Sequence, residues 1–103
     1  MNKTIKYYIK KYDLKVKIGR IPIECCFGEY DNESKVITID KQQIDKAVKH
    51  KIFLAYNGYK SVNIYNKLHA YNYVLLHEIK HAIDDKLAED TACNFAWKRY
   101  KRG

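Results

Sequence analysis

The first part of the chain changes from a helical to a β spacing of apolar residues. In residues 3–12 apolar side chains recur every three or four positions, which predicts a short amphipathic helix. Residues 14–18 then alternate apolar and basic side chains, the pattern of a half-buried strand. Gly19 interrupts this pattern, and a second extended stretch is predicted at residues 23–30. The chain is therefore expected to begin with a helix followed by two strands.

The middle of the chain predicts a hairpin followed by a helix. The unit from Gly28 to Ile39 contains a polar turn and then a β-branched run, which together predict a β-hairpin. Asp40 is suited to cap a helix over residues 41–56, which Asn57-Gly58 would end. Residues 59–65 are equally compatible with a loop and with a short strand.

The last third predicts two helices. One is expected from about residue 66 to 83, because residues 71–76 are largely apolar and contain neither Gly nor Pro. A break at 84–86 precedes a last helix at about 87–101. The sequence therefore predicts one α+β domain spanning residues 1–103, with about three strands and three or four helices.

Composition narrows the class of protein without identifying it. Hydrophobic residues make up 47% of the 103 residues and charged residues 31%, which is typical of a globular domain. The formal net charge is +8, with basic clusters near both ends of the chain. Such a charge favours an acidic or DNA-bound partner. A solvated lysine-rich surface is the simpler alternative, because no arginine-rich run or base-stacking motif accompanies the charge.

Cysteine content and hydropathy predict a cytoplasmic location. The chain has three cysteines, two of them adjacent, and free thiols in a reducing compartment account for them most simply. The N-terminus lacks the apolar segment of a secretory signal. The apolar runs are also much shorter than a membrane span, so no membrane association is expected.

The segment His77-Glu78-Ile79-Lys80-His81 carries the clearest chemistry in the chain. It has the form HExxH, in which two imidazoles four residues apart share one face of a helix and can bind one zinc ion. Glu78 lies beside that face and is predicted to act as general base toward a metal-activated water. A catalytic zinc site needs a third protein ligand, for which the acids that follow are candidates: Asp84, Asp85, Glu89 and Asp90.

The acids at 89–90 begin a second recognisable pattern. The segment Glu89-Asp90-Thr91-Ala92-Cys93-Asn94-Phe95-Ala96 resembles the ExxA-[ND]-x-FA helix that follows HExxH in compact ImmA/IrrE-like metallopeptidases of bacteria, phages and mobile elements. The resemblance covers about residues 24–100. It implies a small zincin-like (minigluzincin) domain in which Glu89 is the third zinc ligand. The chain departs from the family at Lys80, at Cys93 and in the seven residues between His81 and Glu89.

This resemblance implies an intracellular zinc metallopeptidase that cleaves a protein or peptide substrate, such as a regulator of a mobile element or its host. The residue that stabilises the oxyanion is left open among Tyr65, Tyr71, Tyr73 and His69. Two other interpretations remain. The first is a catalytically silent zincin-fold binding module. The second is a basic nucleic-acid-binding regulator in which the histidine pair is incidental.

Overall fold

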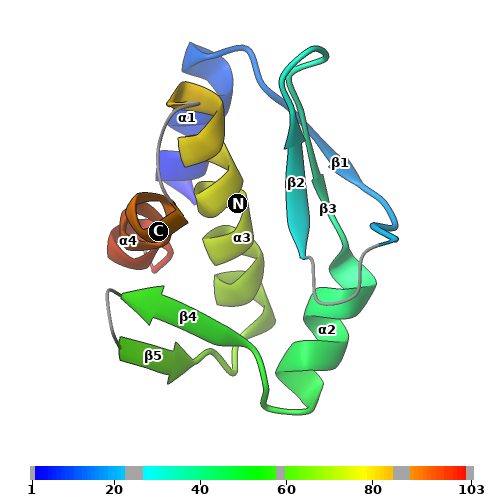
Figure 1. Ribbon diagram of the computed structural model, residues 1–103, viewed down its shortest axis with the longest axis vertical. Helices are drawn as coiled ribbons and strands as arrows, with labels where there is room; N and C mark the ends of the chain where they lie inside the picture. Colours follow the sequence, from blue (N-terminus) through cyan, green and yellow to red (C-terminus); the bar gives the residue numbers. More distant parts are fainter. Residues whose placement is uncertain (1, 23–26, 58–59, 85–88, 102–103) are drawn as a thin grey trace.

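The longest helix, α3 (Lys67–Ile83), runs through the centre of the fold, with the other elements packed around it (Figure 1). The computed structural model describes residues 2–22, 27–57, 60–84 and 89–101. The other helices and strands in these ranges are α1 (Lys3–Lys11), β1 (Lys15–Ile18), β2 (Gly28–Asp31), β3 (Val36–Ile39), α2 (Lys41–Lys49), β4 (Leu54–Asn57), β5 (Lys60–Asn63) and α4 (Glu89–Arg99). This order makes the protein a small α+β domain.

The strands form two separate sheets. In the first, β3 lies between its neighbours, parallel to β1 and antiparallel to β2, so β1 and β2 are the outer strands among the described residues. The predicted hairpin from Gly28 to Ile39 is therefore confirmed. The second sheet is the antiparallel hairpin of β4 and β5. Ile37 and Ile39 of β3 are buried against the central helix, which gives the first sheet its core-facing side.

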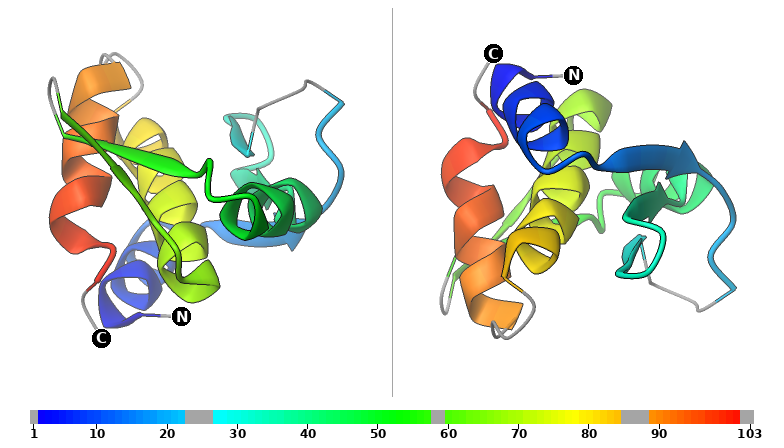
Figure 2. Two further views of the ribbon diagram at one scale, coloured as in Figure 1. Left: turned by 90° about the horizontal axis from the view of Figure 1, so that it is seen from below. Right: turned by 90° about the horizontal axis from the view of Figure 1, so that it is seen from above.

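Helix α3 separates the two sheets. Figure 1 shows β1, β2 and β3 on one side of α3, and α4 with the β4–β5 hairpin on the other. In both views of Figure 2, α4 runs beside α3, and the two helices make the most extensive contact between any two elements. The sequence explains this central position, because Asn72 to Leu76 form an uninterrupted buried run. A helix that is apolar on most of its faces must be covered on most of its faces.

Helix α2 is shorter than the predicted span of residues 41–56. It ends at Lys49, and Lys51 adopts a left-handed conformation with φ of 59°. The Ile52 and Lys51 N–H groups donate to the Ala47 and Val48 carbonyls, which is a Schellman C-cap. The prediction was wrong because it read Ile52 as a further apolar position of the helix and expected the stop at a glycine. Ile52 is 66% exposed.

The residues after this cap form strands that the sequence analysis did not assign. Residues 54–56, predicted as helix, belong to strand β4 (Leu54–Asn57), and the ambiguous segment contains strand β5. The described residues thus hold five strands instead of about three. The helices predicted at 3–12, 66–83 and 87–101 are confirmed with small shifts of their ends. The predictions at 23–26 and 85–86 lie outside the described residues.

None of the helices in the described part of the chain combines the length and the apolar character that crossing a membrane requires.

Asp40 caps α2 and ties it to the preceding loop. Its carboxylate accepts hydrogen bonds from the Ile21 N–H (3.0 Å), the Gln43 N–H (3.1 Å) and the Gln43 side chain (3.0 Å). The bond from Ile21 is the main reason that the pKa of Asp40 lies below its usual value of 3.8. The carboxylate is therefore stabilised in the folded state.

We expect Asp40→Ala to lower the free energy of unfolding at pH 7 by about 1–2 kcal/mol, the usual cost of losing a capping side chain. A carboxyl group whose pKa is depressed on folding stabilises the fold above its unfolded-state pKa, and this stabilisation is lost as the pH falls through the folded-state pKa. Urea denaturation from pH 7 to pH 2 should therefore show the two proteins converging below about pH 4. Asp40→Asn keeps a capping oxygen and should lose less at pH 7. A difference that persists undiminished at pH 2 would contradict the assignment.

Candidate metal centre

The two histidines of HExxH lie together on one face of α3. His77 and His81 are four residues apart in the helix, and their ring centroids are 4.9 Å apart with the planes at 68°. Both rings are partly buried. The arrangement follows from helix geometry, because side chains at i and i+4 are stacked on the same face. The sequence prediction that these two imidazoles converge is consistent with this geometry.

Glu78 is held beside His77 in a largely buried position. Its Oε2 lies 3.0 Å from His77 Nδ1, and the two side chains are 11% and 17% exposed. With a proton on Nδ1, the imidazole donates to the carboxylate and Nε2 keeps its lone pair. A carboxylate on one ring nitrogen is a common way of orienting a histidine whose other nitrogen binds a metal.

The three side chains line one cleft with a volume of about 690 Å³. Its base is α3, from Tyr73 to His81, and its walls come from β2 and from the segment leading into β4. The wall from β2 includes Glu29 and Tyr30, and α4 contributes Cys93. No lysine or arginine is among the described residues that line this cleft, although the chain has twenty.

Gly28 sets the distance between β2 and α3. A Cβ atom at this position would lie 2.7 Å from Val74 Cγ1 and 3.2 Å from Glu78 Cγ. The first distance is too short for a stable contact, so any larger residue would force the strand and the helix apart. The absence of a side chain at Gly28 therefore lets the strand pass directly over the residue predicted as general base.

Helix α4 accommodates the charged residue inside HExxH. The Lys80 ammonium lies 5.4 Å from the centroid of the Phe95 ring, which the Arg99 guanidinium also approaches at 4.1 Å. Phe95 and the neighbouring Ala92 and Ala96 are buried, as the resemblance implied for the face that packs on the HExxH helix. Lys80 thus contacts α4 and is not among the residues that line the cleft.

Tyr73, one of four oxyanion candidates in the sequence, and Cys93, which the sequence analysis gave no role at the site, both line the cleft. The Tyr73 hydroxyl accepts from the Tyr56 N–H at 3.0 Å and donates to the Tyr56 carbonyl at 3.4 Å, which ties α3 to β4. Burial raises the pKa of Tyr73, and the adjacent Cys93 thiol adds to the effect. Helical spacing could have indicated both positions, since Tyr73 is one turn before His77 and Cys93 is one turn after Glu89.

The structure leaves the third ligand undetermined. Glu89 is the first residue of α4, but its side chain and those of Asp85 and Asp90 lie outside what the structure describes. Asp84 is described, is exposed at the C-terminal end of α3 and does not line the cleft. Within the described residues no group of three His, Cys, Asp or Glu side chains is close enough to hold a metal ion. The predicted set of His77, His81 and Glu89 remains a prediction.

Of the four residues considered for the oxyanion, Tyr73 alone lines the cleft. The Tyr71 hydroxyl donates to Asp45 of α2, and burial together with this carboxylate raises the pKa of Tyr71 to about 12. His69 packs edge-on against Tyr100, with ring centroids 5.7 Å apart. Tyr65 is 65% exposed outside the cleft. Tyr73 is thus the best placed of the four, although its hydroxyl already contacts β4.

We expect Gly28→Ala to lower the free energy of unfolding by about 1–3 kcal/mol, because the added methyl group overpacks the contact with Val74. Gly19→Ala is the matched control, since its nearest neighbour would be Thr38 Cγ2 at 3.4 Å, an ordinary contact. Urea denaturation of both variants measures the difference. Equal stability of the two would show that β2 does not approach α3 as closely as described.

Comparison of the chain with protein-family models, with characterised proteins and with solved structures gave no significant match. The resemblance to zincins therefore rests on the sequence motifs alone.

Proposed function

We propose that this protein is a zinc-dependent metallopeptidase with His77, His81 and Glu89 as metal ligands and Glu78 as general base. The observation that carries the proposal is the placement of both imidazoles and the Glu78 carboxylate in one cleft, with the rings 4.9 Å apart. Imidazole and carboxylate groups are ordinary ligands of catalytic zinc. A surface histidine pair would not be expected to share a cleft with a largely buried glutamate.

The third ligand is assigned from the resemblance and from the position of α4. Glu89 begins α4 four residues before Cys93, and Cys93 lines the cleft. Positions four apart in a helix lie on the same face, so the backbone of residue 89 is one turn from a cleft residue. Asp90 is offset from that face by one residue, which makes it the weaker candidate.

Bound zinc supplies Lewis acidity that makes a water molecule nucleophilic at neutral pH. The chain's own contribution is proton transfer and alignment. Glu78 accepts the proton of the attacking water and passes it to the amide nitrogen that leaves. The hydrogen bond between Glu78 and His77 keeps the carboxylate next to the metal-binding face. Because the Glu78 side chain is largely buried, the carboxylate is shielded from bulk water.

A peptide substrate fits the wall of the cleft better than a small molecule does. Strand β2 is an outer strand of its sheet among the described residues and lines the cleft with residues from Gly28 to Tyr30. The free edge of a strand binds an extended peptide through backbone hydrogen bonds, largely independent of its sequence. A substrate aligned on β2 would pass its peptide bonds over Glu78, because Gly28 brings the strand into contact with that residue.

The proposal includes a cytoplasmic location and a regulatory protein as substrate. The location follows from the sequence, because three cysteines, two of them adjacent, are most simply explained by a reducing compartment. The regulatory substrate, from a mobile element or its host, follows only from the resemblance to ImmA/IrrE-like peptidases.

We expect purified protein to contain one zinc ion per chain and to lose it in His81→Ala, whereas Glu78→Gln should retain the zinc. Glu78→Gln should also lower peptide hydrolysis by about 10²–10⁴-fold, the usual contribution of a general base. Elemental analysis and a casein or peptide-library cleavage assay measure the two properties. Glu33→Gln, an exposed change in the β2–β3 turn, and His50→Ala are the matched controls.

Three outcomes are informative. Loss of hydrolysis with zinc retained in Glu78→Gln supports catalysis. If the native protein contained stoichiometric zinc but showed no hydrolysis, the result would contradict the peptidase proposal and favour a catalytically silent zincin-fold module. Absence of zinc from the native protein, with no uptake on addition of the metal, would overturn the metal centre.

We expect Glu89→Gln to weaken zinc binding more than Asp90→Asn or Asp85→Asn does. Loss of an outer hydrogen-bonding partner costs about 10–100-fold in metal affinity, and loss of a direct ligand should cost more. Competition with a chromogenic chelator at pH 7.5 gives the three affinities. A larger effect of Asp90→Asn would identify Asp90, instead of Glu89, as the third zinc ligand.

A further inference from the structure

Charge is unevenly distributed along this basic chain. Ten of the twelve carboxylates fall in residues 21–40 and 78–90, and two of them, Glu29 and Glu78, line the cleft of the candidate metal centre. Residues 41–67 instead carry six lysines and a single acid, Asp45. No lysine or arginine is among the described residues that line that cleft. The basic charge of residues 41–67 needs an explanation separate from the peptidase site.

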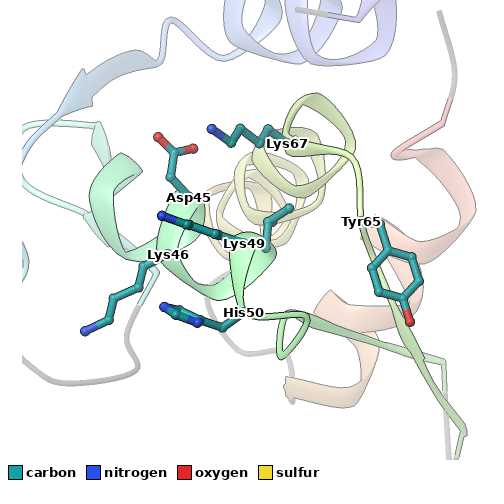
Figure 3. A pocket seen from close by; sticks show the side chains of 7 residues that line it. Asp45, Lys46, Lys49, His50, Tyr65 and Lys67 are labelled. Atoms are coloured by element: carbon teal, nitrogen blue, oxygen red, sulfur yellow. The ribbon is translucent and has the colours of Figure 1, made fainter.

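Part of this charge surrounds a second pocket, with a volume of about 520 Å³, between α2 and the first turn of α3. Its charged and aromatic lining residues are Asp45, Lys46, Lys49, His50, Tyr65 and Lys67. In Figure 3, Lys67 extends from the start of α3 toward Asp45 of α2, whereas Lys46 points away from α3 and Tyr65 lies on the far side. None of these residues lines the cleft that holds His77 and His81.

The lysines of this pocket outnumber its one carboxylate among the described residues. Within the described residues, Lys46, Lys49 and Lys67 form no ion pair. The one carboxylate in the pocket, Asp45, accepts a hydrogen bond from the Tyr71 hydroxyl behind it. Three exposed ammonium groups around a concave surface give a positive potential that attracts anions.

The position of Lys67 is unfavourable for the helix that contains it. Lys67 is the first residue of α3, whose first turn has no acidic residue. A positive charge at a helix N-terminus is destabilising, because the N-terminal end of the helix dipole is itself positive. By contrast, Lys46 and Lys49 lie in the last turn of α2, where a positive charge is favourable. Helix stability therefore accounts for two of the lysines but not for Lys67.

We propose that this pocket binds the phosphodiester backbone of an unpaired nucleic-acid strand. Lysine ammonium groups bind phosphate oxygens, and the 65% exposed Tyr65 offers a ring on which an unpaired base can stack. A cavity of about 520 Å³ admits one or two nucleotides but not a duplex, which favours a single strand. An acidic peptide would match the charge of the pocket but would not explain the exposed ring of Tyr65. The proposal does not depend on the peptidase activity.

The test is fluorescence anisotropy of the full chain with a labelled 20-nucleotide oligo-dT strand, titrated at several KCl concentrations. The triple variant Lys46→Gln, Lys49→Gln, Lys67→Gln should weaken binding at least about tenfold at low salt. It should also reduce the slope of log K against log salt by about 2, since each phosphate contact on a single strand contributes about 0.7. Tyr65→Ala should weaken binding at least about fivefold without changing the slope.

The matched control is the triple variant Lys3→Gln, Lys6→Gln, Lys10→Gln on α1, which removes the same charge from exposed lysines outside the pocket. It should bind within about threefold of the native chain. Glu78→Gln should bind as the native chain does, so failure of the peptidase proposal would leave this result unaffected. Circular dichroism confirms that each variant is folded.

Equal weakening by the two triple variants would overturn the proposal, because it would show diffuse attraction to the whole basic surface. If a poly-glutamate peptide bound as tightly as the oligonucleotide, the result would contradict nucleic-acid binding and indicate an acidic protein partner. Tighter binding of a duplex than of either single-stranded DNA or single-stranded RNA would contradict the assignment of an unpaired strand.

Discussion

Burial of α3 on most of its surface is the constraint on which this structure depends. Asn72 to Leu76, together with Glu78 and Ile79, are buried, so the helix must be covered by a sheet on one side and by α4 with β4 on the other. The buried polar side chains of α3 have hydrogen-bond partners, since Asn72 donates to the Tyr100 carbonyl and Glu78 contacts His77. A chain of 103 residues can build one modest core, and here that core is organised around a single helix.

The same constraint gives the candidate metal centre its position. Because α3 is central, the histidines on its partly exposed face lie at the base of a cleft whose walls are neighbouring strands. Gly28 lets one wall touch the helix, and the Tyr73 hydroxyl ties the other wall to it through Tyr56. The candidate chemistry therefore lies on the central, largely buried helix, which favours alignment of a general base with its substrate.

The separation of charge is a second consequence of this architecture. The acids Glu29 and Glu78 line the cleft, whereas Lys46, Lys49 and Lys67 line the second pocket, on α2 and at the start of α3. The described residues of the cleft include no lysine or arginine, so they place no fixed positive charge next to a divalent cation, where it would weaken metal binding by repulsion. The proposed strand-binding pocket and the proposed peptidase cleft can thus coexist in one small domain.

The sequence by itself determined the α+β class, the helices of residues 3–12 and 66–83, the hairpin from Gly28 to Ile39 and the convergence of His77 with His81. All of these depend on short-range periodicity or on helix spacing, which local residues specify. Tertiary structure alone decided the early end of α2 at Lys49, because a left-handed lysine gives no signal comparable to glycine. It also brought Tyr73 and Cys93 into the cleft with β2, since contacts between distant segments depend on how α3 is covered and not on any local pattern.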